Sequence, residues 1–315
     1  MTRRKTNGLI AAPFTPMHAD GALNLEAIDG YAGWLHGNGV VGAFICGTTG
    51  EGTSLTLEER RQVAARWVAV APSGLRVIVH VGGNSLADCR ALTAHAASLG
   101  ADSVACMAPF FFKIRNVAEL VEWCAEVASA APQLPFYYYH IPSMTGASVP
   151  VAEFLAAAAN RIPNLVGVKY TFEDLEDYAR CLRFADGRYD VLFGRDELLL
   201  SALSLGARGA VGSTYNFAAP QYRRLIDAFS RGDQRMAAVL QAQAVQMIDD
   251  CVKSGAHPIA AFKWLMSRVG LDCGPTRLPL MTITAVQAKA LAAKLDALKD
   301  FSWNSREAVA TRAST

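Results

Sequence analysis

Eight short apolar runs, each followed by a longer segment with helical character, constrain the fold of this chain more than any other feature. Successive runs begin roughly 20–35 residues apart, about the length of one strand and one helix. Most runs are continuously apolar rather than alternating, which is typical of parallel strands covered by helices. We predict strands at residues 9–12, 42–45, 76–80, 103–107, 136–140, 165–169, 190–193 and 209–211.

The segments between the runs carry helix signals. Thr56 precedes a predicted helix at 57–71, and Ser85 opens another that Gly100 ends. Pro220 stands where a further helix is expected to begin. Beyond the eighth run no strand is expected, and we predict helices at 220–231, 233–253, 258–269 and 284–298.

Eight strand–helix units favour a closed (β/α)8 barrel, the TIM barrel of the α/β class, although an open doubly wound sheet fits the same pattern. The chain has 315 residues, of which 52% are hydrophobic, and about 250 residues are typical of one barrel. We expect the barrel at residues 1–231, a C-terminal helical extension packed on it at 232–300, and a flexible polar tail at 301–315.

Composition argues against several classes of function. The net charge of +2 is too small for a nucleic-acid partner. No apolar stretch reaches the ~20 residues that span a membrane, and a signal peptide is not expected. The seven cysteines form no Cys-x-x-Cys pair, which indicates reduced thiols in a cytoplasmic protein. The six histidines show no zinc-ligand spacing, so no metal is expected.

The catalytic residues of barrel enzymes lie where the strands end. Here the second, fifth, sixth, seventh and eighth predicted strands each run into polar residues, which should converge on one cavity. These segments are 47–52, 137–142, 169–171, 194–197 and 212–216.

Lys169 closes an apolar run and is the sharpest candidate among these residues. An amine at the end of a buried strand is partly desolvated, which favours its neutral, nucleophilic form. A neutral lysine condenses with a ketone to form an iminium, which accepts electrons from a breaking carbon–carbon bond. The competing interpretation is a lysine that extends from the strand end into solvent.

The other candidates each have a structural alternative. The hydroxyls of Thr48 and Thr49, in a glycine-rich turn, could bind a carboxylate, or the turn could be a plain connection. Tyr139 could relay a proton or simply pack in the core. Asp196 and Glu197 could bind sugar hydroxyls or stabilise a helix N-terminus.

Three motifs in order resemble the pyruvate-dependent class I aldolase superfamily of dihydrodipicolinate synthase and N-acetylneuraminate lyase. They are Gly-Thr-Thr-Gly-Glu at 47–51, Tyr-x-x-Pro at 139–142 and Gly-Val-Lys at 167–169. The resemblance covers nearly the whole chain. The segments most similar to the lyases, and especially to the animal-type form, are 134–142, 209–216 and 274–280.

The resemblance implies a reaction and a set of roles. Lys169 would form a Schiff base with a small 2-keto acid, Tyr139 would shuttle a proton, and no other cofactor would be required. Thr48 and Thr49 would hold the α-keto carboxylate. The residues that would line the sugar end of the substrate are Thr171, Gly194, Asp196, Glu197 and Ser213. The resemblance also implies a homotetramer.

Two departures argue against the synthase branch. Met144 stands where synthases place an arginine for the second substrate's carboxylate, and residues 109–112 lack the hydroxyl of a tyrosine that synthases supply across the subunit interface. Arg195 is unexpected in a lyase and, if it points inward, favours a doubly acidic or shorter substrate. Phe111 and Met144 would make the substrate end more apolar.

Other activities therefore stay open. Related enzymes act on 2-keto-3-deoxy sugar acids or on ylidenepyruvates. A non-catalytic sensor of keto acids or sugars would need neither a nucleophile nor a proton relay, so the presence of both Lys169 and Tyr139 argues against it.

Overall fold

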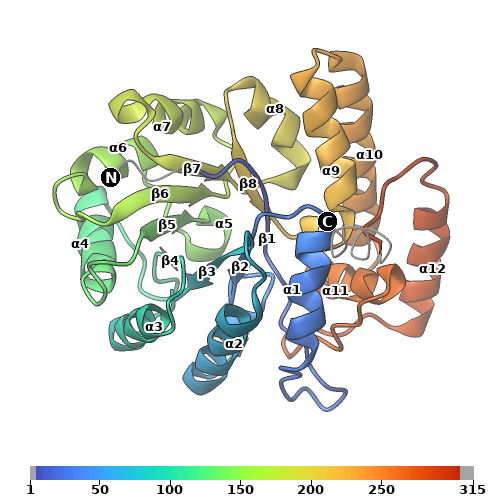
Figure 1. The fold of residues 1–315 in the computed structure, drawn as a ribbon, viewed down its shortest axis with the longest axis horizontal. Coiled ribbons are helices and arrows are strands. Elements are labelled where there is room, and N and C mark those ends of the chain that lie inside the picture. The colour runs from blue at the N-terminus through green and yellow to red at the C-terminus, as the bar shows by residue number, and fades with distance from the viewer. Residues whose placement is uncertain (1–4, 306–315) are drawn as a thin grey trace.

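A closed barrel of eight parallel strands, in sequence order, forms the centre of the molecule (Figure 1). The computed structural model describes residues 5–305. The barrel predicted from the apolar runs is confirmed, and the open sheet is excluded. The strands are β1 (Gly8–Ala11), β2 (Gly42–Ile45), β3 (Arg76–His80), β4 (Ser103–Met107), β5 (Phe136–His140), β6 (Leu165–Tyr170), β7 (Asp190–Phe193) and β8 (Gly209–Gly212).

Side chains that alternate along each strand separate two apolar regions. Ile10, Phe44 and Tyr139 belong to a small buried cluster formed by side chains from the strands. Leu9 and Tyr138, their neighbours along β1 and β5, belong to the larger core, which the strands form with the surrounding helices. Both faces of the sheet are buried, which explains the continuously apolar runs.

Helices α1 to α8 and two short 3-10 turns, η1 and η2, connect the strands. Thr56 accepts a hydrogen bond from the Glu59 amide, and the Glu59 side chain accepts one from the Thr56 amide, so this helix begins with a capping box. Ser85 caps its helix as predicted. The elements are α1 (Ala27–Gly37), η1 (Gly52–Ser54), α2 (Leu57–Val70), α3 (Leu86–Ser98), α4 (Val117–Ala128), α5 (Pro142–Thr145), α6 (Val151–Ala158), α7 (Leu175–Gly187), η2 (Asp196–Leu198) and α8 (Leu199–Ser204).

Helix α9 (Tyr215–Ser230) begins five residues earlier than the predicted start at Pro220. Its backbone breaks at Ala218, where φ is −132°, so the helix has a kink. A proline inside a helix lacks the amide hydrogen and clashes with the carbonyl four residues before it, which here belongs to Asn216. The kink relieves that clash and lets the helix start directly after β8.

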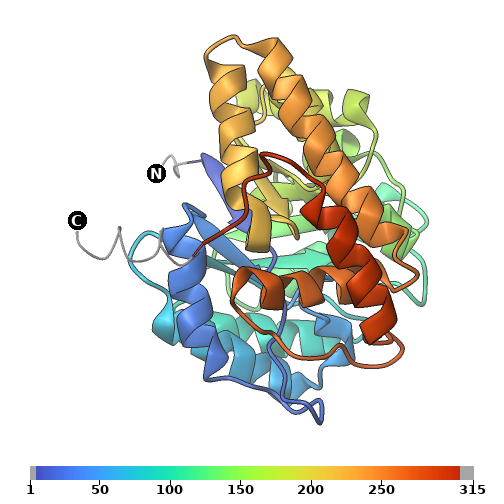
Figure 2. The same ribbon diagram turned by 90° about the vertical axis from the view of Figure 1, so that its right-hand side faces the viewer.

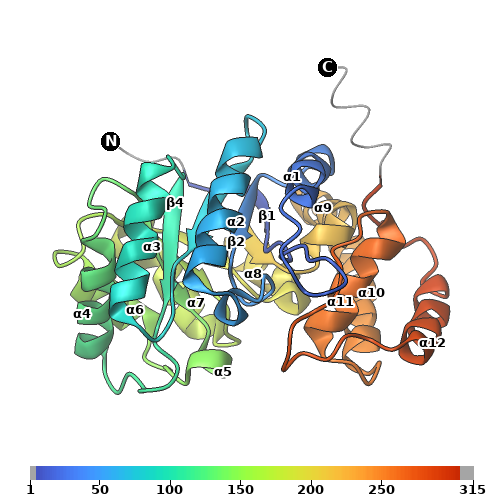
Figure 3. The same cartoon turned by 90° about the horizontal axis from the view of Figure 1, so that it is seen from below.

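Three further helices lie at one side of the barrel, next to α1 and α9, as Figures 2 and 3 show. They are α10 (Gln234–Val252), α11 (Pro258–Val269) and α12 (Ala285–Asp296). No helix within residues 5–305 has the length and apolar content to cross a membrane.

The first residues of the predicted flexible tail pack against the barrel, contrary to expectation. Asn304 is buried; its side chain accepts a hydrogen bond from the Ala219 amide at 2.8 Å and donates one to the Asn216 carbonyl at 3.0 Å. Pro220 has no amide hydrogen to donate to the Asn216 carbonyl, so Asn304 and the Trp34 indole donate to it instead. Residues 306–315 of the predicted tail lie outside the described residues.

Candidate active site

Lys169 lies near the C-terminal end of β6 and is 4% exposed. Its Nζ lies 4.1 Å from the ring centroid of Phe44 on β2 and 4.1 Å from that of Tyr139 on β5. The lysine therefore points into the barrel mouth between two aromatic faces, and it does not extend into solvent. Tyr139 and Lys169 are direct register partners in the sheet, so the barrel itself fixes their separation.

Tyr139 is buried, but its phenol also reaches a polar partner. The hydroxyls of Tyr139 and Thr48 lie 3.3 Å apart, within hydrogen-bond distance. The phenol ring packs edge-on against Phe44 and His80, with centroid separations of 5.3 Å and 5.5 Å. The ring thus belongs to the barrel interior while the oxygen joins the polar residues at the strand ends.

His80, at the end of β3, was missed as a site residue. Its Nδ1 lies 3.0 Å from the Cys46 carbonyl, which can only accept, so Nδ1 carries the hydrogen. Its Nε2 is buried and has no hydrogen-bond partner among the described residues. Burial, together with the charges of Arg60 and Lys169, lowers the pKa of His80 to about 3, so the imidazole is neutral at pH 7. A polar residue closing an apolar run was the available sequence signal.

The loop that follows β2 brings both predicted threonines to the same strand ends. Thr49 is buried, and its hydroxyl lies 2.6 Å from that of Ser213 in the segment after β8. The turn is closed by hydrogen bonds from the amides of Glu51 and Gly52 to earlier carbonyls in the loop. A Cβ at Gly52 would lie 1.9 Å from the Cys46 carbonyl oxygen, so only glycine fits this position.

Asp196 is buried beside the segment after β8. Its Oδ2 accepts hydrogen bonds from the Thr214 amide at 3.0 Å and from the Thr214 hydroxyl at 2.6 Å. Its Oδ1 has no partner within residues 5–305. Burial and the neighbouring charge of Glu197 raise the pKa of Asp196 to about 6. The carboxylate is thus held on one oxygen and leaves the other as an acceptor.

Thr171 and Gly194 lie against each other at the ends of β6 and β7. A Cβ at Gly194 would lie 2.0 Å from the Thr171 hydroxyl, so the glycine leaves the space that this hydroxyl occupies. Thr171 Oγ1 is buried without a partner in the described part of the chain. Buried polar atoms are normally paired, so Thr171 Oγ1 and Asp196 Oδ1 are both suited to a ligand that supplies the partner.

Arg195 does not present a free positive charge to the site. It forms ion pairs with Glu173 and, at 3.4 Å, with Glu197, and its side chain is 30% exposed. Two carboxylates therefore compensate the guanidinium, which removes the reason to expect a doubly acidic substrate. Phe111 and Met144 are 73% and 53% exposed and are not part of the buried cluster of the barrel.

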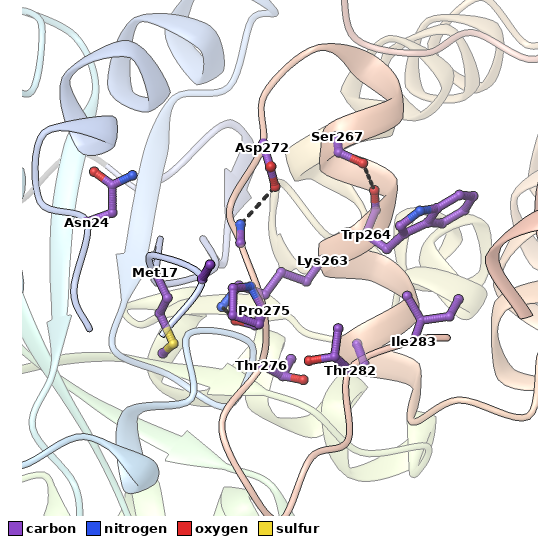
Figure 4. A pocket seen from close by; sticks show the side chains of 13 residues that line it. Met17, Asn24, Lys263, Trp264, Ser267, Asp272, Pro275, Thr276, Thr282 and Ile283 are labelled. Carbon is purple, nitrogen blue, oxygen red and sulfur yellow. Dashed lines mark hydrogen bonds between the residues drawn. The ribbon is translucent and has the colours of Figure 1, made fainter. Parts of the chain in front are cut away.

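A pocket of about 550 Å³ lies away from these residues, between the segment after β1 and the C-terminal helices (Figure 4). Met17, Trp264 and Pro275 are among its lining residues. None of the predicted site residues lines it. Within residues 5–305, no group of three or more His, Cys, Asp and Glu side chains is arranged to hold a metal ion.

Known proteins resemble the chain over nearly its whole length. The N-acetylneuraminate lyase of Rattus norvegicus is 42% identical over 305 residues, which cover 96% of this chain and 95% of that protein. The solved structure of Proteus mirabilis N-acetylneuraminate lyase is 43% identical with a TM-score of 0.91, and the match covers 95% of this chain and 100% of that one. The N-acetylneuraminate lyase of Aliivibrio salmonicida, a sialic acid aldolase, gives the same identity and TM-score, with coverage of 95% and 99%. A model of the dihydrodipicolinate synthetase family matches residues 5–298. The resemblance predicted from the three motifs is confirmed: this chain belongs to the dihydrodipicolinate synthetase family.

Proposed function

We propose that this protein is a carbon–carbon lyase that reversibly cleaves N-acetylneuraminate to pyruvate and N-acetylmannosamine through a Schiff base on Lys169. The observation that carries the proposal is the buried Lys169 amine, 4.1 Å from the Tyr139 ring at the barrel mouth. The identity to lyases of this name, at 42–43%, supports the choice of substrate.

The carboxylate of the bound keto acid would be held by the Thr48 and Thr49 hydroxyls. Thr48 is within hydrogen-bond distance of the Tyr139 phenol, so a carboxylate held there lies beside both catalytic groups. Fixing the carboxylate orients the adjacent ketone toward the amine, which is a contribution of positioning. The unpaired oxygens of Thr171 and Asp196 would meet hydroxyls of the sugar chain, with Gly194, Glu197 and Ser213 around them.

The first step joins the enzyme to its substrate. The neutral Lys169 amine adds to the C2 ketone. The resulting hydroxyl leaves as water with the proton of the Tyr139 phenol, which gives an iminium and a Tyr139 phenolate. Three aromatic rings, of Phe44, Tyr139 and the neutral His80, pack together beside the amine. These rings enclose the Lys169 side chain, which is 4% exposed.

The second step breaks the carbon–carbon bond. The Tyr139 phenolate takes the proton of the C4 hydroxyl, the C3–C4 bond breaks, and the iminium receives the electron pair as an enamine. The aldehyde leaves as N-acetylmannosamine. Protonation of the enamine at C3 and addition of water then release pyruvate and the free lysine, and no metal or organic cofactor takes part.

We further propose a cytoplasmic homotetramer. All seven cysteines are buried and unpaired, which suits a reducing compartment. The tetramer rests on the family resemblance alone, and size-exclusion chromatography with light scattering would measure it.

A substrate panel tests the proposed reaction. Pyruvate release should be fastest with N-acetylneuraminate and much slower with 2-keto-3-deoxy sugar acids of six carbons. A preference for the shorter acids would contradict the proposed substrate. Saturable binding of the panel without pyruvate release would contradict catalysis and favour a sensor.

A further inference from the structure

A buried ion pair joins the Gly47–Gly52 loop to the C-terminal helices. Glu51 Oε1 lies 2.9 Å from Lys263 Nζ on α11, and their side chains are 0% and 1% exposed. The second oxygen, Glu51 Oε2, accepts a hydrogen bond from the Arg277 amide at 2.8 Å. Lys263 also donates to the Pro275 carbonyl at 2.6 Å, toward which it points in Figure 4. Both oxygens of Glu51 are therefore bound by residues of the C-terminal extension.

The backbone conformation of Glu51 couples this ion pair to the conformation of the Gly47–Gly52 loop. Glu51 has a φ of 54°, in the left-handed region that side-chain-bearing residues rarely adopt. Its amide closes the turn onto the Thr48 carbonyl at 3.1 Å. Contacts that hold the far end of the Glu51 side chain thus also hold this turn, and Thr48 and Thr49 are part of it.

Both charged side chains are almost fully buried. Burial lowers the pKa of Lys263, and the charge of Glu51 opposes that shift. Loss of either partner would leave an uncompensated charge in the interior, which is strongly destabilising. The pair therefore fixes the position of the Glu51 side chain relative to α11.

We infer that the Glu51–Lys263 ion pair is a positioning device through which the C-terminal helices set the place of Thr48 and Thr49 relative to Lys169. The inference rests on the proposed role of these threonines in holding the substrate carboxylate. Neither Glu51 nor Lys263 touches the substrate in this account. Their effect should appear in the affinity for pyruvate, the smallest ligand with the required carboxylate.

The test measures pyruvate affinity and stability separately in four variants. Borohydride reduces the iminium to a stable amine, so the trapping rate against pyruvate concentration gives a half-saturating value, and thermal unfolding gives Tm. The variants are Glu51→Gln, Lys263→Met, their combination, and Asp190→Asn. Asp190 is the matched control because it is a buried carboxylate that accepts from Thr6 and Tyr137 at the opposite, N-terminal end of the strands.

Both single variants should raise the half-saturating pyruvate concentration roughly tenfold, because small displacements of a positioning group have effects of this order or larger. They should also lower Tm. The combined variant has no unpaired buried charge, so its Tm should recover while the half-saturating concentration stays raised. If the single variants do not fold, the combined variant carries the test alone. Asp190→Asn should lower Tm only.

An unchanged half-saturating concentration in the ion-pair variants would overturn the inference, as would an equal rise in Asp190→Asn. The inference would also be overturned if, in the combined variant, both Tm and the half-saturating pyruvate concentration returned to their wild-type values. The variant Thr49→Val distinguishes an error in the inference from an error in the proposed carboxylate site. If Thr49→Val has no effect on pyruvate affinity, the site itself is wrong; if it weakens affinity and the ion-pair variants do not, only the inference fails.

Discussion

Three buried polar atoms without hydrogen-bond partners in residues 5–305 belong to residues at or just after the C-terminal ends of the barrel strands. Thr171 Oγ1, Asp196 Oδ1 and His80 Nε2 are buried and unpaired within the described residues. A buried polar atom without a partner destabilises a fold by about 1–3 kcal/mol. Thr171 and Asp196 both lie where strands end, and a bound polyhydroxy acid would supply the missing partners.

Tyr139→Phe tests the proton relay. The substitution keeps the ring that packs on Phe44 and His80 and removes only the hydroxyl near Thr48. Lyase turnover should fall by about 10²–10⁴-fold, the usual contribution of a general acid–base. Circular dichroism should show an intact fold. Turnover within a fewfold of wild type would exclude Tyr139 as the relay.

Asp196→Asn tests the buried carboxyl through the pH dependence of stability. Because the pKa of Asp196 is raised from 3.8 to about 6, its contribution favours the fold at low pH and is lost as pH rises through about 6. The asparagine variant escapes this loss, so its free energy of unfolding relative to wild type should increase between pH 4 and pH 8. The expected increase is on the order of 3 kcal/mol.

Denaturant unfolding at several pH values measures this difference. Lyase activity of the same variant should fall, because the free carboxylate oxygen is lost. A difference in stability that does not vary with pH would show that the Asp196 carboxyl does not titrate as described.

The elements of the barrel follow from local sequence signals more closely than their connections do. Every predicted strand exists, and most boundaries agree within one residue, because a continuous apolar run has few alternatives in a barrel. Thr56 and Ser85 cap their helices through side-chain hydrogen bonds that sequence spacing encodes. Helix α9 differed because Pro220 lies inside the helix, next to a kink that Asn304 contacts, and not at the helix start.

The substitution Asn304→Ala tests how much the contact of Asn304 with the kink in α9 stabilises the fold. The substitution removes the side-chain acceptor of the Ala219 amide at the kink in α9 and one of the two donors to the Asn216 carbonyl, which keeps the hydrogen bond from the Trp34 indole. The free energy of unfolding should fall by about 1–3 kcal/mol. Ser302→Ala, a neighbour whose hydroxyl accepts a hydrogen bond from Arg224 near the surface, is the control and should change it by less than about 0.5 kcal/mol. Equal stability of the two variants would contradict the capping role.

Over the whole molecule, the sequence predicted which strand ends come together but not which distant residues hold them in place. The predicted residues at five strand ends do meet, since parallel strands end at one face of a barrel. The Glu51–Lys263 pair spans 212 residues, and no local pattern indicates which buried charges meet at that distance. His80 was missed although it closes an apolar run, because the rings that surround it, of Phe44 and Tyr139, come from other strands.

The proposed lyase reaction depends on the Schiff base on Lys169, which borohydride reduction in the presence of pyruvate, followed by peptide mass mapping, would detect. We expect one adduct per chain, on the peptide that contains Lys169, and none in Lys169→Ala or in the absence of pyruvate. An adduct on another lysine, or no adduct under conditions in which pyruvate is released from N-acetylneuraminate, would contradict the proposed Schiff base.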